Sequence, residues 1–217
     1  YLHEIIPSEY LRRKKILLDI GIDTSKYPPA RDENRTLNLL YVGRLTRYKG
    51  PEILIKAVKD LKGTDFILNI LGEGEEEYHL KKLVDEFDLR SKVVFHGFRN
   101  AEEVKEFYSK ASIFCAPAIT ESIGIVYFEA MASGLPIIAV NNGGPQFICP
   151  DQGAIKIPVK TEQEIIREFR DSILILATNP EKRRKMGEFN RKYCIKNYDW
   201  KILEKNILHF FEEEVVR

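Results

Sequence analysis

Short apolar runs alternate with longer amphipathic segments from about residue 37 to the end of the chain. Each short run stops at a glycine, a proline or another turn residue, which predicts buried β-strands. The longer segments carry apolar residues every three or four positions, which predicts helices with one buried face. The predicted strands are residues 37–42, 66–71, 92–96, 112–116, 136–140 and 154–157. The predicted helices are residues 51–61, 75–87, 101–109, 123–133, 161–177, 180–196 and 199–214.

The order of these elements predicts the fold class. Apolar strands that alternate with helices are typical of an α/β fold with a doubly wound parallel sheet, covered by helices on both faces. Residues 1–35 differ from this pattern, since a predicted helix at 10–19 with a basic run at 12–15 leads to Pro28-Pro29. We interpret residues 1–35 as a connector and the basic run as a solvated helix face.

The amino-acid composition excludes several classes of protein. The chain has 217 residues, of which 44% are hydrophobic, and this excludes intrinsic disorder. Its 34 Lys and Arg residues nearly balance 33 Asp and Glu residues, so no overall field attracts nucleic acid or anionic lipid. Three widely spaced cysteines argue against zinc or a disulfide framework and favour a reducing compartment. Neither a signal-peptide pattern nor an apolar run of the roughly 20 residues that span a bilayer is present.

Ligands of an open parallel sheet bind at the carboxyl ends of its strands. Loops rich in small and charged residues follow the first four predicted strands: Gly43-Arg44-Leu45 with Lys49, Gly72-Glu73-Gly74, Gly97-Phe98-Arg99, and Thr120-Glu121-Ser122-Ile123-Gly124. We expect these loops to open onto one crevice.

Two common nucleotide-binding motifs are excluded. Gly72 and Gly74 resemble the start of GxGxxG, but Glu77 occupies the third glycine position, and the acids at 75–77 would repel a pyrophosphate. The P-loop pattern GxxxxGK[ST] does not occur. A tight turn is therefore the simpler interpretation of residues 72–74, and a dinucleotide-dependent dehydrogenase is not expected.

The loop after the fourth predicted strand is the stronger anion site. Ser122, Ile123 and Gly124 open a predicted helix, whose free backbone N–H groups and dipole suit a diphosphate. Arg44 and Lys49, at the end of the neighbouring predicted strand, would add compensating positive charge. Together these residues predict phosphate binding.

Two carboxylates bracket this anion site. Glu129 lies eight positions after Glu121, a helical rise of roughly 12 Å, which approximates the distance from a sugar to a ribose across a diphosphate. Glu129 lies among apolar neighbours, so its charge needs hydrogen-bond donors or a cation. From the residues alone, ribose hydroxyls and a buried salt bridge with Arg or Lys are equally good interpretations.

Several motifs together resemble the donor-binding domain of retaining family 4 glycosyltransferases. They are Val42-Gly43-Arg44-Leu45 with Lys49-Gly50, Leu71-Gly72-Glu73-Gly74, His96-Gly97-Phe98, and residues 120–139, in which Glu121 and Glu129 match the family's paired-Glu motif. The resemblance runs from about residue 37 to 148, and the trailing helices also fit. It implies a GT-B fold, in which two Rossmann-like domains face a cleft.

The resemblance also implies a role for each matching residue. Arg44 and Lys49, with backbone amides near Ser122, Ile123, Gly124 and Ile125, would hold the diphosphate. Glu121 would contact the transferring sugar, and Glu129 would contact the ribose. The turn at Gly97-Phe98 would lie against the nucleobase, with Gly43 and Gly72 nearby. The implied catalytic residues are Glu121, Arg44 and Lys49.

The implied reaction moves a hexose from a nucleoside diphosphate sugar, UDP-, GDP- or ADP-linked, to an acceptor hydroxyl with retention of configuration. Arg44 and Lys49 would stabilise charge that develops on the leaving diphosphate. No cofactor and no metal are implied, since the four histidines show no ligand spacing. The expected partners are the donor and a sugar, polysaccharide or lipid-linked acceptor, without nucleic acid. The expected location is the cytoplasm, and association with the inner membrane face stays open.

Two departures from the family pattern matter. Gln146 and Phe147 follow the Gly143-Gly144 turn where family members often carry a Glu, which leaves sugar contacts from this loop in doubt. The N-terminal acceptor domain of the family has no counterpart in this sequence, which begins at Tyr1 rather than Met. We therefore expect residues 1–35 to be its last helix and the interdomain linker, 36–178 the Rossmann-like domain, and 179–217 helices that pack on this domain or towards the other. This portion alone would be inactive.

Two other functions stay open at this point. A nucleotide-sugar epimerase of the same fold would need acid/base carboxylates or histidines at the cleft, and the Gly43-Arg44 and Lys49-Gly50 signature argues against it. A non-catalytic binding module is the third possibility. The presence of Arg44, Lys49, Glu121 and Glu129 argues for the enzyme.

Overall fold

A computed structural model describes residues 20–30, 36–61 and 63–214 of the chain. Its centre is a six-stranded sheet in the order β3-β2-β1-β4-β5-β6, and every pairing is parallel. This confirms the predicted doubly wound α/β fold. The strands are β1 (Leu37–Val42), β2 (Phe66–Leu71), β3 (Val93–Gly97), β4 (Ile113–Ala116), β5 (Ile137–Val140) and β6 (Ala154–Ile157).

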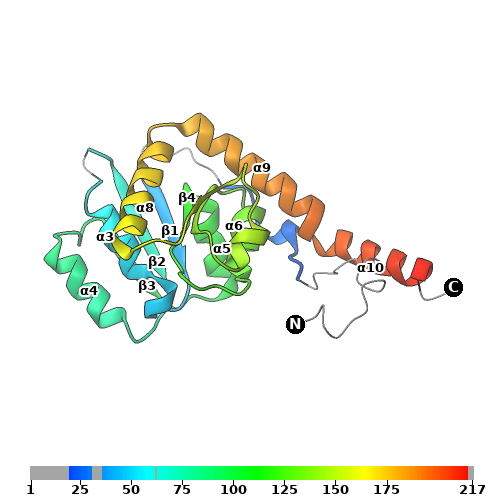
Figure 1. The fold of residues 1–217 in the computed structure, drawn as a ribbon, viewed down its shortest axis with the longest axis horizontal. Helices are drawn as coiled ribbons and strands as arrows, with labels where there is room; N and C mark the ends of the chain where they lie inside the picture. The colour runs from blue at the N-terminus through cyan, green and yellow to red at the C-terminus, as the bar shows by residue number, and fades with distance from the viewer. Residues whose placement is uncertain (1–19, 31–35, 62, 215–217) are drawn as a thin grey trace.

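Helices connect and cover the strands (Figure 1). They are α3 (Pro51–Val58), α4 (Glu77–Glu86), α5 (Ala101–Lys110), α6 (Ile125–Ala132), α7 (Gly144–Ile148), α8 (Glu162–Ala177), α9 (Pro180–Tyr198) and α10 (Trp200–Glu214), with the 3-10 turns η1 (Thr24–Lys26) and η2 (Arg47–Lys49).

One local prediction needs correction, and two short elements after β1 and β5 were not predicted. The helix expected from residue 123 begins at Ile125, because Gly124 has φ 73° and cannot continue the helix backbone. The residues after the Gly143 turn form the short helix α7, since Pro145 in its first turn has a fixed, helix-compatible φ. The η2 turn was not predicted, because three residues carry no helical periodicity.

The core has two parts, one on each face of the sheet. On β1, Leu39 and Tyr41 point to one face and Leu40 to the other, as strand geometry requires. The first face packs against α3, α4 and α8, and the second against α5, α6 and α9. Figure 1 shows α3, α4 and α8 on one side of the strands and α5 and α6 on the other. All three cysteines are buried and free within this core.

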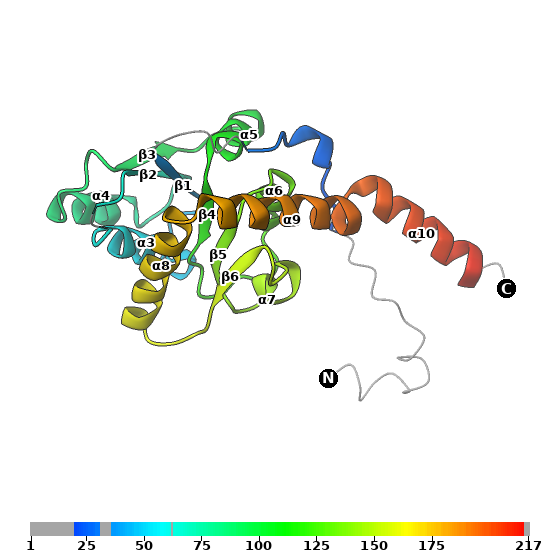
Figure 2. The same cartoon turned by 90° about the horizontal axis from the view of Figure 1, so that it is seen from above.

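The segment at 20–30 and the last helices bind the same side of the domain. Ile22 donates its N–H to the Tyr198 carbonyl at 2.9 Å, and Ala30 donates to the Ser133 carbonyl at 2.7 Å. Helix α9 packs on α6, where the Phe128 and Tyr198 rings meet edge to face at 4.8 Å. Figure 2 shows α9 crossing the domain and α10 extending beyond it.

The helix predicted at 10–19 and its basic run lie outside the described residues. Of the helices in the described part of the chain, none combines the length and the apolarity needed to cross a membrane. The division into a linker, a domain and C-terminal helices stays a prediction.

Candidate functional site

A cavity of about 200 Å³ opens where β1 and β4 end. Six of the predicted site residues line it: Gly43, Arg44, Lys49, Glu121, Gly124 and Ile125. Tyr41 and Tyr127 also line it, and neither was predicted as a site residue. The carboxyl edge of the sheet therefore brings together the expected cations, one carboxylate and the start of α6.

Lys49 and Glu121 form an ion pair in this cavity. Their side chains are only 21% and 11% exposed, so water screens the pair far less than a surface salt bridge. Lys49 ends η2, and Gly50 turns the chain into α3 with φ 68°. A Cβ at Gly50 would lie 2.5 Å from the Pro117 carbonyl oxygen, so glycine lets this loop pack directly on the end of β4.

Arg44 lies at the mouth of the cavity and is exposed. Its Nη2 donates to the Tyr48 hydroxyl, and its carbonyl accepts a 2.9 Å hydrogen bond from the Tyr41 hydroxyl. The Tyr48 ring centroid lies 5.6 Å from the Lys49 ammonium. Burial and the Glu121 charge raise the pKa of Tyr41, so its hydroxyl stays a donor. Both tyrosines contact residues of the loop at 43–50, which carries Arg44 and Lys49 and is called the cationic loop below. Neither tyrosine was predicted as a site residue.

Helix α6 presents its N-terminus to the cavity through Gly124, Ile125 and Val126. No side chain caps this end. The first N–H groups of a helix lack partners within the helix and carry partial positive charge. Glycine is required at the cap, because a Cβ at Gly124 would lie 2.8 Å from the Tyr127 ring at a φ of 73°. The geometry of an anion site is thus present.

The turn at Gly143-Gly144 fixes the backbone of Glu121. The Gly144 N–H donates to the Glu121 carbonyl at 2.7 Å, and a Cβ at Gly143 would lie 2.1 Å from that same oxygen. Gln146 and Phe147, the residues that depart from the family pattern, are both exposed. This loop therefore holds the carboxylate through its glycines rather than through a side chain.

Glu129 lies deeper along α6 and does not line the cavity. Its two carboxylate oxygens accept hydrogen bonds from the hydroxyls of Tyr27, at 2.9 Å, and Tyr108, at 3.0 Å. Within the described part of the chain the donors to Glu129 are these two phenols, and no Lys or Arg pairs with it there. Neither tyrosine could be predicted, because Tyr27 is 102 residues away in sequence.

The remaining predicted residues lie around the cavity without lining it. Gly72 packs on the Gly43 carbonyl, where a Cβ would approach to 2.0 Å, and its N–H donates to the Gly97 carbonyl at 2.9 Å. Phe98 is 70% exposed, and its N–H donates to Glu73 Oε1 at 3.1 Å. The loops after β1, β2 and β3 are therefore joined along one edge. Ser122 and Ile123 are exposed on the loop before α6.

One group of possible metal ligands occurs among the residues described. Ligand atoms of Glu52, Glu76 and His79 lie within 4.8 Å of one another. The Lys56 ammonium is 2.8 Å from Glu52, so a cation already compensates this carboxylate. The group lies outside the cavity lining and is not part of the site.

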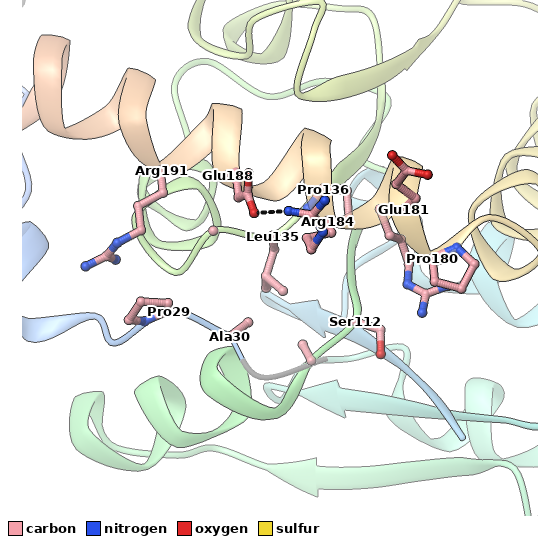
Figure 3. A pocket seen from close by; sticks show the side chains of 13 residues that line it. Pro29, Ala30, Ser112, Leu135, Pro136, Pro180, Glu181, Arg184, Glu188 and Arg191 are labelled. Atoms are coloured by element: carbon pink, nitrogen blue, oxygen red, sulfur yellow. Dashed lines mark hydrogen bonds and ion pairs between the residues drawn. The ribbon is translucent and has the colours of Figure 1, made fainter. Parts of the chain in front are cut away.

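A larger cavity of about 520 Å³ lies at the opposite edge of the sheet, beside Ser112 and Pro136 (Figure 3). Its arginines already have structural partners. Arg184 pairs with Glu188, and Arg191 donates to the Ala132 carbonyl at the end of α6. Because ligands of open parallel sheets bind at the carboxyl edge, the smaller cavity is the candidate site.

Comparison with known proteins agrees with this geometry. The sequence model of the family described as "Glycosyl transferases group 1" matches residues 24–193. The chain belongs to this family. An uncharacterized glycosyltransferase from Haemophilus influenzae is 37% identical over 166 residues, which cover 75% of this chain and 45% of that protein. The chain therefore spans less than half the length of this group 1 relative.

Two solved structures show the same fold. The C-terminal domain of the protein LpcC from Francisella tularensis aligns with a TM-score of 0.71 at 24% identity, over 83% of this chain and 100% of that domain. Anabaena HepE in complex with UDP-glucose aligns with a TM-score of 0.75 at 19% identity, over 89% of this chain and 56% of HepE. The chain thus has the fold of the C-terminal domain of a group 1 glycosyltransferase.

Proposed function

We propose that the protein transfers a hexose from a nucleoside diphosphate sugar to an acceptor hydroxyl with retention of configuration, and that this chain supplies the donor site. One observation carries the proposal. Arg44, Lys49 and the uncapped N-terminus of α6 converge with Glu121 on one cavity at the carboxyl edge of the sheet. Three sources of positive charge beside one carboxylate suit a diphosphate joined to a sugar.

The diphosphate would lie between the cationic loop and α6. Lys49 would share its ammonium between Glu121 and a phosphate oxygen, and Arg44 would bind from the mouth. Glu121 would accept hydrogen bonds from hydroxyls of the transferring sugar. Because Glu121 is already paired, its orientation is set before the donor arrives.

The chemistry would proceed on one face of the sugar. The bond from the anomeric carbon to the diphosphate oxygen breaks, and the bond to the acceptor oxygen forms on the same face. The acceptor proton passes to the leaving phosphate. Arg44 and Lys49 stabilise charge that develops as the bond breaks, so their effect is larger in the transition state than in the bound donor. An alternative route would use Glu121 as a nucleophile that attacks the anomeric carbon. The ion pair of Glu121 with Lys49 argues against it, because the carboxylate is already occupied by the ammonium.

The nucleoside would extend away from the sugar along the joined loops. Glu129 would bind ribose hydroxyls, and the Gly97-Phe98 turn would lie against the base. The exposed Phe98 ring supports this placement, since it offers an apolar face to a planar group. The base could be uracil, guanine or adenine. Uracil has one argument in its favour, since the structure of HepE, which has the same fold, holds UDP-glucose.

The acceptor site belongs to the part of the protein outside this chain. We propose that residues 1–35 lead from an N-terminal acceptor domain, that 36–178 form the donor domain, and that 179–217 are C-terminal helices. The 217-residue chain alone would bind donor without catalysing transfer. The acceptor would be a sugar, a polysaccharide or a lipid-linked sugar, and the protein would work in the cytoplasm or at the inner membrane face.

A ligand panel tests the donor site directly. We expect UDP, GDP or ADP to raise the melting temperature of the 217-residue chain, with one base preferred, whereas inorganic phosphate does not. Absence of a shift with every diphosphate contradicts the proposal. For the complete protein, release of the nucleotide with an acceptor and an unchanged anomeric configuration are expected. Formation of an epimer from the donor alone would instead identify an epimerase.

A further inference from the structure

The second carboxylate of the paired-Glu motif depends on a residue ahead of the sheet. Tyr27 follows η1 in the segment at 20–30, and its hydroxyl donates to Glu129 Oε1 at 2.9 Å. Tyr108, on α5, donates to Glu129 Oε2 at 3.0 Å. Each oxygen of the carboxylate is therefore fixed by one phenol, and the two phenols come from different parts of the chain.

We infer that Tyr27 is a positioning residue for the nucleotide, which fixes the Glu129 carboxylate so that its remaining lone pairs accept the ribose hydroxyls. The inference rests on the ribose role proposed for Glu129 and adds the group that sets its orientation. It also links the segment ahead of β1 to donor affinity.

The chemistry of the three groups fits this role. An ionised carboxylate offers about four acceptor sites, and the two phenols use two of them. Two sites remain, which matches a ribose diol with its two O–H donors. Burial, followed by the nearby Glu129 charge, raises the pKa of both Tyr27 and Tyr108. Both phenols therefore stay protonated and remain hydrogen-bond donors to Glu129.

The position of Tyr27 is itself fixed by the C-terminal helices. Arg191, on α9, donates to the Tyr27 carbonyl at 2.8 Å, and Figure 3 shows its side chain extending towards the segment with Pro29. Asp199, between α9 and α10, accepts hydrogen bonds from the Thr24 backbone N–H at 3.2 Å and from its hydroxyl. The Tyr27 ring packs edge-on against Tyr108 at 6.3 Å. These contacts hold the backbone around Tyr27, and the contact with Tyr108 holds its ring beside Glu129.

The coupling has a measurable consequence. If Tyr27 acts through Glu129, its hydroxyl strengthens the binding of only those ligands that carry ribose hydroxyls. If Tyr27 has a general structural role, loss of its hydroxyl weakens the binding of every ligand of the site by the same factor. The dependence of affinity on the ribose hydroxyls therefore separates the two.

The experiment uses calorimetry to measure six affinities for each variant of the 217-residue chain. The ligands are UDP, GDP, ADP and the 2′,3′-dideoxy analogue of each. The test variant is Tyr27→Phe. The matched control is Tyr198→Phe, which removes another buried phenol whose hydroxyl bonds the Ile148 carbonyl at 3.4 Å and does not contact Glu129. Tyr108→Phe removes the second donor to Glu129 and gives an independent reading. Thermal unfolding of each variant reports its folding.

We expect Tyr27→Phe to weaken the preferred ribonucleotide about tenfold, the typical effect of one hydrogen bond to a charged group, and to leave its dideoxy analogue unchanged. Tyr108→Phe should act in the same way, and Tyr198→Phe should change neither affinity. Equal weakening of the ribonucleotide and the dideoxy analogue by Tyr27→Phe overturns the inference. If the unmodified chain does not distinguish ribose from dideoxyribose, the ribose role proposed for Glu129 fails instead. If it binds none of UDP, GDP and ADP, the proposed function fails.

Discussion

Glu121 and Glu129 belong to one sequence motif, yet the fold treats the two carboxylates differently. Glu121 lines the cavity at the carboxyl edge of the sheet and forms an ion pair with Lys49, the last residue of η2. Glu129 has no cation partner among the described residues and is held by the phenols of Tyr27 and Tyr108. Opposite charge therefore compensates the first carboxylate, and neutral donors compensate the second.

This difference in partners suggests a different function for each carboxylate. An ion pair beside a diphosphate can redistribute charge when the phosphate leaves, because the ammonium can move between two anions. A carboxylate held by neutral donors keeps its full negative charge and acts as a fixed acceptor. The first arrangement suits the reacting end of the donor, and the second suits recognition of its nucleoside.

The largest effect is expected where the ion pair is broken. In the complete protein, Lys49→Ala should lower kcat/KM about 100- to 1,000-fold, because it removes charge stabilisation of the leaving diphosphate. Lys82→Ala removes an exposed lysine, 3.8 Å from Glu86, and should leave kcat/KM unchanged. Steady-state kinetics on both variants checks this, and a loss below threefold for Lys49→Ala would remove it from the mechanism.

The next effect concerns the turn that holds Glu121. Gly143→Ala places a Cβ 2.1 Å from the Glu121 carbonyl oxygen at a φ of 65°, so it should lower the free energy of unfolding by about 3 kcal/mol. Gly63→Ala provides the control, since its φ is 75° but no atom lies within 4 Å of the new Cβ. It should cost about 1 kcal/mol. Equal losses in denaturant unfolding would show that the contact with Glu121 is unimportant.

A smaller effect separates the two carboxylates. Glu129→Gln should weaken binding of the preferred nucleoside diphosphate about tenfold, since it replaces a charged acceptor of the ribose with a neutral one. Glu121→Gln should change this affinity less than threefold, because a diphosphate without a sugar does not reach its carboxylate. Calorimetric titration of both variants with the same nucleotide measures the two losses of affinity. Equal losses would contradict the division of roles.

The smallest effect concerns the anchor of the Tyr27 segment and depends on pH. Burial raises the pKa of Asp199, but hydrogen bonds from Thr24 and the Lys201 N–H outweigh it and lower this pKa overall. A carboxylate whose pKa is lower in the folded state adds stability above its unfolded pKa of about 3.9, and this stability is lost as the pH falls through the folded pKa. Asp199→Asn should therefore lower the free energy of unfolding by about 1 kcal/mol at pH 7. The difference should shrink below about pH 3.9, and a constant difference across this range would contradict the assignment.

Much of the fold could be predicted from the sequence, because its signals are local. The apolar runs of β1 to β6 and the periodicity of the helices identified every strand and all helices of eight residues or more among the described elements. The short elements η2 and α7 were missed, since they depend on turn chemistry rather than on periodicity. The start of α6 was placed too early, because the left-handed backbone of Gly124 cannot be read from a hydrophobic pattern.

The site could be predicted only in part, for a related reason. Strand-end position was enough to bring Arg44, Lys49 and Glu121 to one cavity, since parallel strands end at one edge. The partners of Glu129 could not be found in this way. Tyr27 precedes the sheet in a segment that the sequence presents as a connector. Arg191 on α9, Asp199 after it and Ser133 after α6 hold this segment in place, and none of these contacts has a sequence signal.

The most direct test of the account is a crystal structure of the 217-residue chain with the nucleoside diphosphate that gives the largest thermal shift. The account predicts phosphate oxygens within hydrogen-bond distance of Arg44, Lys49 and the first N–H groups of α6. It also predicts ribose hydroxyls on Glu129 while Tyr27 still donates to that carboxylate. Phosphate density away from Arg44 and Lys49, for instance in the cavity beside Arg184 and Arg191, would contradict it.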